Sequence, residues 1–427
     1  MPGYDAPNKK EGRVLIMKKT VKILASLLAF MLLLTGCASN AAESDPKSQP
    51  SDSSESTPIE VKKLTGGTEL ELKPELKVRL IGLYNNKLLL CKSVQDTDED
   101  GEYLDTGSDI YYTYDISTGE KTDVGKMAYV SSSAGDYVMM GDQRVYNALT
   151  GGNPMGQIFF SLGLEGGKEK IIEKDESNTF PLCFLSPLND DEIIINNYCV
   201  LQAENDICEY RVRKYNVRTG VFTELIKTEY NRTKGRGKAV SIVSCYNNKI
   251  HVYALDFKGK GEYKSYIEIY NTNGELLEAC DAELIEKETS KNEDSVWEIG
   301  VYGNCYVAGT LNGNSYIFVK EGNEFRKVAE APGYTFMTTS MKGSNKIPEY
   351  VLLTSWPNKE IRLFDVKEQK LYAFELSLDN ECKYYNAWVI DDKGNFVFEL
   401  SSSDHYDENA VLKYYYLSAE EIKKQLA

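Results

Sequence analysis

The sequence has few of the residues on which hydrolytic and redox sites commonly depend. It contains two histidines and three tryptophans, and it has no Cys-x-x-Cys, His-Glu-x-x-His or Gly-x-Ser-x-Gly motif. A zinc hydrolase needs histidine or cysteine ligands at short spacing, and an α/β-hydrolase needs its nucleophile elbow. The sequence therefore predicts no catalytic residue, no metal site and no bound cofactor.

Helical periodicity is also scarce. Most apolar segments after residue 75 are short and β-branched or aromatic, and they end in Gly, Asn or Asp, as at 88–91 and 396–400. This punctuation is typical of β-strands. One exception is the C terminus, where Ser418 and Glu421 predict a capping box for a short helix that runs to Leu426.

The N-terminal segment has the parts of an export leader. Lysines at 18–22 precede an uncharged apolar stretch at 23–34, which is shorter than the roughly 20 residues of a membrane span. The sequence Leu-Thr-Gly-Cys that follows resembles the lipobox of bacterial lipoproteins. This resemblance implies that Cys37 is diacylated and becomes the first mature residue. Because residues 1–16 are polar, we expect translation to start at Met17.

Three regions are therefore predicted: a signal peptide over 1–36, a lipidated tether over 37–59 and a folded domain over 60–427. Residues 38–58 contain no aromatic, Leu, Ile or Val and should not order themselves. Two acyl chains hold a protein stably on a bilayer, so we expect the chain on the extracytoplasmic face of the cell membrane.

The net charge of the chain is −16, and residues 1–36 carry six basic and two acidic residues, which leaves about −20 on the mature protein. Nucleic-acid partners and an electrostatic grip on anionic lipid both require clustered cations. This acidic balance therefore predicts no nucleic-acid partner, and it leaves the acyl chains on Cys37 to hold the protein to the bilayer.

Two series of turns recur with a period near fifty residues. The first joins an aromatic residue to Asp or Asn and a tight turn, as at 114–120 and 215–220, with intervals of 47 to 54 residues from 119 to 369 and a further step to 418. The second series lies at 84–86, 135–136, 189–190, 246–248, 303–304, 344–345 and 392–394. Two hairpin turns per unit give four strands per unit, which is the pattern of a propeller blade.

We therefore expect an all-β fold, a β-propeller of about seven four-stranded blades, with six or eight blades or an immunoglobulin-like sandwich as alternatives. The last unit holds only three strands, and residues 68–72 alternate as a strand does, so this segment is expected to add the missing outer strand. Together with the Tyr-Asp-x-x-Thr-Gly-Glu turn, the architecture resembles exported TolB-like and WD40-like lipoproteins. That resemblance implies no particular site residue.

Eight cysteines follow Cys37, and several of them, such as Cys91, lie within apolar runs. We expect these cysteines to be thiols that pack as small apolar groups, with a local Cys199–Cys208 disulfide as the alternative.

One acidic segment has a metal-binding pattern. Asp96, Asp98 and Asp100 place oxygen ligands at alternate positions before Gly101, as a calcium loop does. The twelfth position is Gly107 where an EF-hand has Glu, so the loop is incomplete. An acidic hairpin between two strands is the favoured interpretation, and no metal site is predicted.

The remaining candidates for functional residues are the histidines and the tyrosines. We expect His251 to be a strand residue and His405 to lie in a solvated loop, neither of them a base. Thirty tyrosines suit packing between blades, with a minority lining a sugar- or peptide-binding surface. In the last unit, Tyr414 and Tyr416 should share one face of a strand while Tyr415 takes the other.

These features predict a membrane-anchored, non-catalytic binding or scaffold module for a protein, peptide or glycan partner. The alternative is a propeller enzyme, a hydrolase or lyase, that acts on extracellular polysaccharide or peptide through carboxylates in a central funnel. Solute capture for a transporter is disfavoured because such receptors are two-lobed α/β proteins, whereas the helices of that fold are missing from this pattern.

Overall fold

The computed structural model describes residues 60–64, 67–70, 72, 79–99, 101–130, 134–140, 144–150, 157–163, 170–175, 183–202, 206–291, 295–336, 349–355, 361–376, 382, 384–391, 393–403 and 410–426. All of them belong to the compact unit that spans residues 58–427. The predicted signal peptide, the whole predicted tether with Cys37, Asp100 and His405 lie outside the described residues. Among those described, neither helix is long and apolar enough to span a bilayer.

The described strands form six sheets built from four-stranded antiparallel units that follow one another along the chain. The first unit holds β3 (Arg79–Tyr84), β4 (Lys87–Thr97), β5 (Tyr103–Asp115) and β6 (Lys121–Val130). The second holds β7 (Ala134–Met140), β8 (Arg144–Thr150), β9 (Gln157–Gly163) and β10 (Lys170–Asp175). The third holds β11 (Cys183–Asn189), β12 (Glu192–Gln202), β13 (Ile207–Asn216) and β14 (Phe222–Asn231).

The fourth unit holds β15 (Arg236–Tyr246), β16 (Lys249–Gly259), β17 (Glu262–Tyr270) and β18 (Leu276–Asp281). The fifth holds β19 (Val296–Tyr302), β20 (Cys305–Thr310), β21 (Ser315–Glu321) and β22 (Glu324–Ala331). The sixth holds β23 (Tyr334–Phe336), β24 (Tyr350–Ser355), β25 (Ile361–Asp365) and β26 (Lys370–Leu376), and the last holds β27 (Tyr384–Ile390), β28 (Phe396–Ser401) and β29 (Leu412–Leu417). A short β14–β15 pairing joins the third and fourth units into one eight-stranded sheet.

The first turn series falls between the third and fourth strands of a unit, and its chemistry is local. Asp115 Oδ1 accepts the backbone N–H groups of Ser117 and Thr118 at 2.9 and 3.0 Å. The side chains of Asn216 and Asp365 make the same turn in their own units. An Asx side chain that bonds its own backbone two or three residues on fixes such a turn without tertiary help, which is why the series was readable in the sequence.

The second series falls between the first and second strands, with one error. Asn85, Asn86, Asn247 and Asn248 all have positive φ, as a two-residue hairpin turn of the primed type requires. The predicted turn at 135–136 is wrong. Those residues lie inside β7 and pair with Leu149 and Ala148, so the strand ladder overrides the turn preference of Gly-Asp. Residues 344–345 lie outside the described part of the chain.

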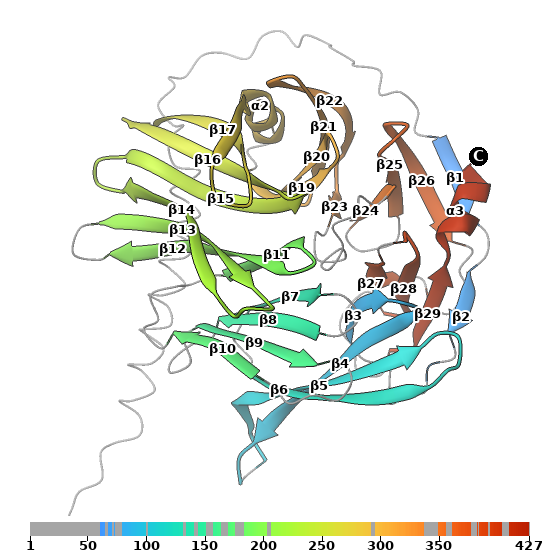
Figure 1. Ribbon diagram of the computed structural model, residues 1–427. Coiled ribbons are helices and arrows are strands. Elements are labelled where there is room, and N and C mark those ends of the chain that lie inside the picture. Colours follow the sequence, from blue (N-terminus) through green and yellow to red (C-terminus); the bar gives the residue numbers. More distant parts are fainter. Residues whose placement is uncertain are drawn as a thin grey trace, which may run out of the picture. The chain divides into compact units, whose positions relative to one another are not determined.

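The units pack face to face in chain order, as the blades of a propeller do (Figure 1). Each shared apolar cluster draws on two neighbouring units. One cluster joins Ile194 to Val252, the next joins Ile267 to Phe318, and the last joins Val397 back to Leu88. The first strands of successive units, β7, β11, β15 and β19, contact one another. The predicted β-propeller architecture is therefore confirmed.

The antiparallel order of the strands also determines at which end of a unit each loop lies. Because the strands alternate in direction, both turn series lie at one end of the units, here called the turn end. The loops between second and third strands and the connections between units lie at the other, here called the loop end.

The outer strand predicted for the last unit is confirmed. β2 (Thr68–Leu70) pairs antiparallel with β29, and Leu70 and Leu72 are buried in the cluster that joins the last unit to the first. Closure of this kind covers a sheet edge that would otherwise invite pairing with another chain. A strand that the sequence did not predict, β1 (Glu60–Leu64), pairs parallel with β26 at the outer edge of the sixth unit.

Two helices occur among the described residues. The predicted C-terminal helix is α3 (Ala419–Leu426), and its capping box is present, because Ser418 Oγ and N–H both donate to Glu421 Oε2. The other helix, α2 (Glu283–Ser290), connects β18 to β19 at the loop end and was missed. Eight residues with few apolar positions carry too weak a periodicity to predict a helix.

The six cysteines whose side chains the structure describes carry thiols. Burial raises the pKa of the Cys280 thiol to about 11 and that of Cys245 to about 12. Cys208 is one of these buried thiols, so the alternative of a Cys199–Cys208 disulfide is wrong. Such cysteines pack as small apolar groups, as predicted.

Candidate functional site at the loop end

His251 lies in β16 as a core residue. Its Nδ1 is 2.9 Å from the hydroxyl of Tyr306, and burial, followed by the charges of Lys249 and Lys320, lowers its pKa to about 4. His251 is 6% exposed and packs between the fourth and fifth units, so the prediction that it is a strand residue is confirmed.

The acidic segment is a hairpin between β4 and β5, as favoured. Asp98 Oδ1 accepts the N–H of Glu102 at 2.9 Å, and the N–H of Gly101 donates to the Asp98 carbonyl oxygen. The aspartate therefore shapes the turn itself. Within the described part of the chain, no group of three or more His, Cys, Asp or Glu side chains lies close enough together to hold a metal ion.

The tyrosines of the last unit are packing residues. Tyr414 is fully buried and Tyr416 packs in the same cluster, between the last unit and the first. Tyr415 packs on the other face, against the sixth unit. This alternation confirms the predicted faces and assigns none of the three to a binding surface.

A different set of aromatic residues forms a row at the loop end. Tyr230, Phe257 and Tyr263 come from β14, β16 and β17, with ring centroids 4.5 Å apart for the first pair and 5.5 Å for the second. Tyr230 and Phe257 are half-buried and Tyr263 is 43% exposed. We call these three residues the aromatic row.

A glycine makes the row possible. Gly237 on β15 pairs with Tyr230 on one side and with Phe257 on the other, so it lies between the two rings in the sheet. A Cβ there would lie 2.2 Å from the Glu229 carbonyl oxygen and 3.0 Å from Tyr230 Cα, and the φ angle of Gly237 is +122°. With no side chain in the gap, the two aromatic rings close over the strand between them.

Glu286 of α2 fixes the outer end of the row. Its carboxylate accepts hydrogen bonds from the hydroxyls of Tyr263, at 2.6 Å, and of Tyr253. Burial and this carboxylate raise the pKa of both tyrosines, so both stay protonated as donors. The Tyr263 ring is thus held in place while almost half of it remains exposed to solvent.

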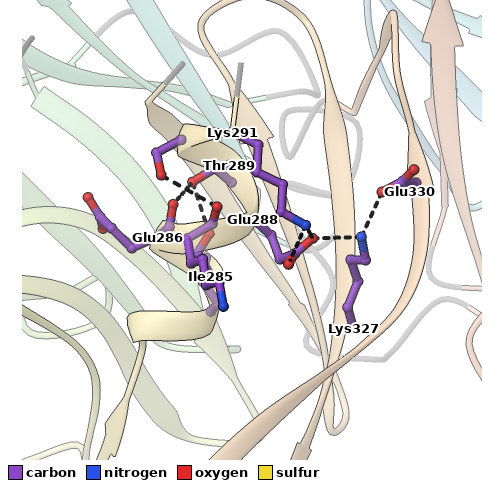
Figure 2. Close-up of polar contacts among 9 residues, drawn as sticks. Ile285, Glu286, Glu288, Thr289, Lys291, Lys327 and Glu330 are labelled. Carbon is purple, nitrogen blue, oxygen red and sulfur yellow. Dashed lines mark hydrogen bonds and ion pairs between the residues drawn. The ribbon is translucent and has the colours of Figure 1, made fainter. Parts of the chain in front are cut away.

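The helix that carries Glu286 is itself anchored on its other side (Figure 2). Glu288 binds Lys291 at 2.7 Å and Lys327 of β22 at 2.6 Å, and Lys327 also binds Glu330 at 2.7 Å. Although burial raises the pKa of Glu288, the hydrogen bonds from the two lysines lower it below its ordinary value overall. Glu286 and Glu288 therefore fix α2 to two successive units.

Sequence reasoning missed this site because its members are 27 and 6 residues apart and no motif links them. The one local signal is a pair of similar tips, Gly-Arg-Gly at 235–237 and Gly-Lys-Gly at 259–261. Each lies where a strand meets a turn, and the second is flanked by Phe257 and Tyr263 at two residues on either side. Whether these two segments lie close to the aromatic row depends on the β14–β15 pairing, which joins two separate units.

Comparisons with known proteins give architecture alone. No protein-family model matches the chain, and no curated protein matches it. It is similar to an oligogalacturonate lyase from Vibrio parahaemolyticus, with 11% identity and a TM-score of 0.45 over 81% of this chain and 91% of that one.

Two further solved structures are comparable. An α-L-arabinofuranosidase from Fusarium graminearum shares 10% identity at a TM-score of 0.40, over 68% of this chain and 94% of that one. An α-L-arabinanase from Penicillium chrysogenum shares 9% at 0.40, with the same two coverages of 68% and 94%. Likeness at this level assigns neither a family nor an activity. The fold and the site together define a β-propeller with a fixed aromatic surface at its loop end.

Proposed function

We propose that this chain is a lipid-anchored, extracytoplasmic binding protein that presents the aromatic row to a glycan without cleaving it. The observation that carries the proposal is the row itself, three aromatic rings held by the fold and left partly open to solvent. Aromatic rings offer a flat apolar face to the C–H face of a sugar, and tyrosine keeps a hydroxyl for hydrogen bonding. Rings already fixed by their neighbours lose little entropy on binding.

The proposed location of the protein at the membrane rests on the sequence. The lysine cluster, the short apolar stretch and the lipobox-like Leu-Thr-Gly-Cys support acylation at Cys37, and the polar segment after it supports a flexible spacer. In a Cys37→Ser variant we expect labelled fatty acid to be lost and the protein to leave the membrane fraction. Retention of the label on the variant would contradict this part of the proposal.

Binding is tested with the whole mature chain by affinity electrophoresis in gels that contain soluble polysaccharides, followed by calorimetry on those that retard it. We expect Phe257→Ala and Tyr263→Ala each to weaken glycan binding up to about tenfold, as the loss of a ring contact worth roughly 0.5–1.5 kcal/mol would. The matched control is Trp297→Ala, since Trp297 is a 52% exposed aromatic residue on β19 outside the row. Equal loss in the control and the row variants would overturn the assignment.

The alternative function is an enzyme that acts on polysaccharide at the same end. Glu286 is a carboxylate in direct contact with the row, and its two oxygens accept the hydroxyls of Tyr253 and Tyr263. An assay for new reducing ends and for unsaturated products on each retarding polysaccharide separates the two. Cleavage that Glu286→Gln abolishes would replace the binding function with an enzymatic one.

A further inference from the structure

Two segments next to the aromatic row, called tips here, are basic, whereas the chain as a whole is acidic. Residues 232–238 contain two arginines, two lysines and no acidic residue, and residues 258–264 contain three lysines and one glutamate. The whole chain carries a net charge of −16. A local cluster of this sign on an acidic protein creates a restricted region of positive potential.

Most of this positive charge is not neutralised. Three of the seven cations form ion pairs: Arg232 with Asp206 at 3.9 Å, Lys238 with Glu268 at 2.5 Å, and Lys258 with Asp256. Four others make no ion pair with any described residue, namely Lys234, Arg236, Lys260 and Lys264, and all four are exposed.

The two tips lie against each other. A Cβ on Gly235 would lie 3.8 Å from Gly259 Cα and 4.0 Å from the Lys260 nitrogen, so the turns are in van der Waals contact. A Cβ on Gly259 would lie 3.0 Å from Arg236 Nε, so this arginine crosses the neighbouring turn. Cations from the β14–β15 connection, the start of β15 and the β16–β17 loop therefore gather beside the strand ends that carry the aromatic row. We call Lys234, Arg236 and Lys260 the basic tip.

From this juxtaposition we propose that the glycan is anionic, a polysaccharide whose carboxylate or phosphate groups bind the basic tip while its sugar rings stack on the aromatic row. This inference rests on the proposed glycan-binding function. A guanidinium and two ammonium groups suit either anion, and charge-assisted hydrogen bonds to them are stronger than neutral ones. The acidic remainder of the molecule repels an anionic polymer elsewhere and so directs it to this tip.

The test compares matched polymers that differ in charge. Carboxymethylcellulose and polygalacturonate are set against hydroxyethylcellulose and methyl-esterified polygalacturonate, with poly(glycerol phosphate) as the phosphate-bearing arm. We expect the anionic members to retard the protein more strongly, and binding to fall as salt is raised. We expect the Arg236→Gln/Lys260→Gln variant to lose about tenfold in affinity for them, and Lys126→Gln/Lys393→Gln, the same charge change at exposed positions elsewhere, to lose little.

The outcomes separate this inference from the proposed function. In one outcome the protein binds neutral and anionic members alike, and this binding is unchanged in the basic-tip variant but lost in Phe257→Ala. That outcome would overturn the anionic ligand and leave glycan binding in place. No retardation by any polysaccharide would overturn both. Binding to phosphatidylglycerol vesicles in place of every polysaccharide would assign the tip to the membrane surface and overturn the inference.

Discussion

The rings of Tyr230 and Phe257 lie with their centroids 4.5 Å apart, although their strands, β14 and β16, are separated by β15. Adjacent strands lie about 4.8 Å apart, so residues two strands apart are normally too distant for ring contact. Gly237 between them removes the side chain that would separate the rings. The candidate binding surface therefore depends on one backbone position that bears no functional group.

Gly237→Ala should disrupt this arrangement. The new Cβ would overlap the Glu229 carbonyl oxygen, and the φ angle of +122° disfavours any L side chain, so we expect a loss of about 2–4 kcal/mol in the free energy of unfolding. Urea denaturation measures it. The control is Gly322→Ala, where φ is +64° and a Cβ meets nothing within 4 Å, with an expected cost of about 1–2 kcal/mol. Equal costs at the two positions would contradict the steric argument.

Glu288→Gln should loosen the anchor of α2 in a pH-dependent way. The folded pKa of Glu288 is lowered, so its charge stabilises the fold above its unfolded value of about 4.5, and this contribution is lost as pH falls through the folded pKa. Because both lysine partners are partly exposed, we expect a cost of about 1–2 kcal/mol at neutral pH and a smaller difference near pH 3. Urea midpoints at the two pH values test this, and a pH-independent difference would rule out the charge as its source.

His251 should make the protein sensitive to mild acid. Its folded pKa of about 4 lies below the ordinary value of 6.5, so the unfolded chain binds the proton first, and stability falls as pH drops from about 6.5 toward 4. For a group this buried, the effect is of order 2–3 kcal/mol. We expect His251→Phe to be less stable at pH 7, through loss of the Tyr306 hydrogen bond, but to show a shallower decline between those pH values. A parallel decline in both proteins would mean that other groups set the slope.

Leu70→Ala should weaken the closure of the last unit. Leu70 is 7% exposed and packs with residues of both the first and the last unit, so its truncation should cost about 2–4 kcal/mol. Thermal unfolding measures the loss, with Val94→Ala, which is 40% exposed on β4, as a control within about 0.5 kcal/mol of wild type. A loss no larger than that of the control would show that β2 adds little to closure.

Local chemistry explains which features were predictable. The Asp115, Asn216 and Asp365 turns are closed by hydrogen bonds within three residues, and the Ser418–Glu421 box spans one helical turn. Such features are written in contiguous residues and recur with the unit, so the four-stranded period could be read from them. The prediction at 135–136 failed because the same Gly-Asp chemistry was outweighed by strand pairing across β7 and β8.

The sequence by itself determined the strands, most of their turns, the capped terminal helix and the need for an outer strand from the N-terminal side, because each follows from short-range periodicity or hydrogen bonding. Only the tertiary structure decided that the rings of Tyr230, Phe257 and Tyr263 contact one another in a row, that α2 places Glu286 within hydrogen-bond distance of the Tyr263 hydroxyl, and that the turns of Gly235 and Gly259 touch. These contacts join residues of different strands, and the contact between Tyr230 and Phe257 joins two units. Their geometry depends on strand register and on a glycine gap, neither of which leaves a periodic signal in the chain.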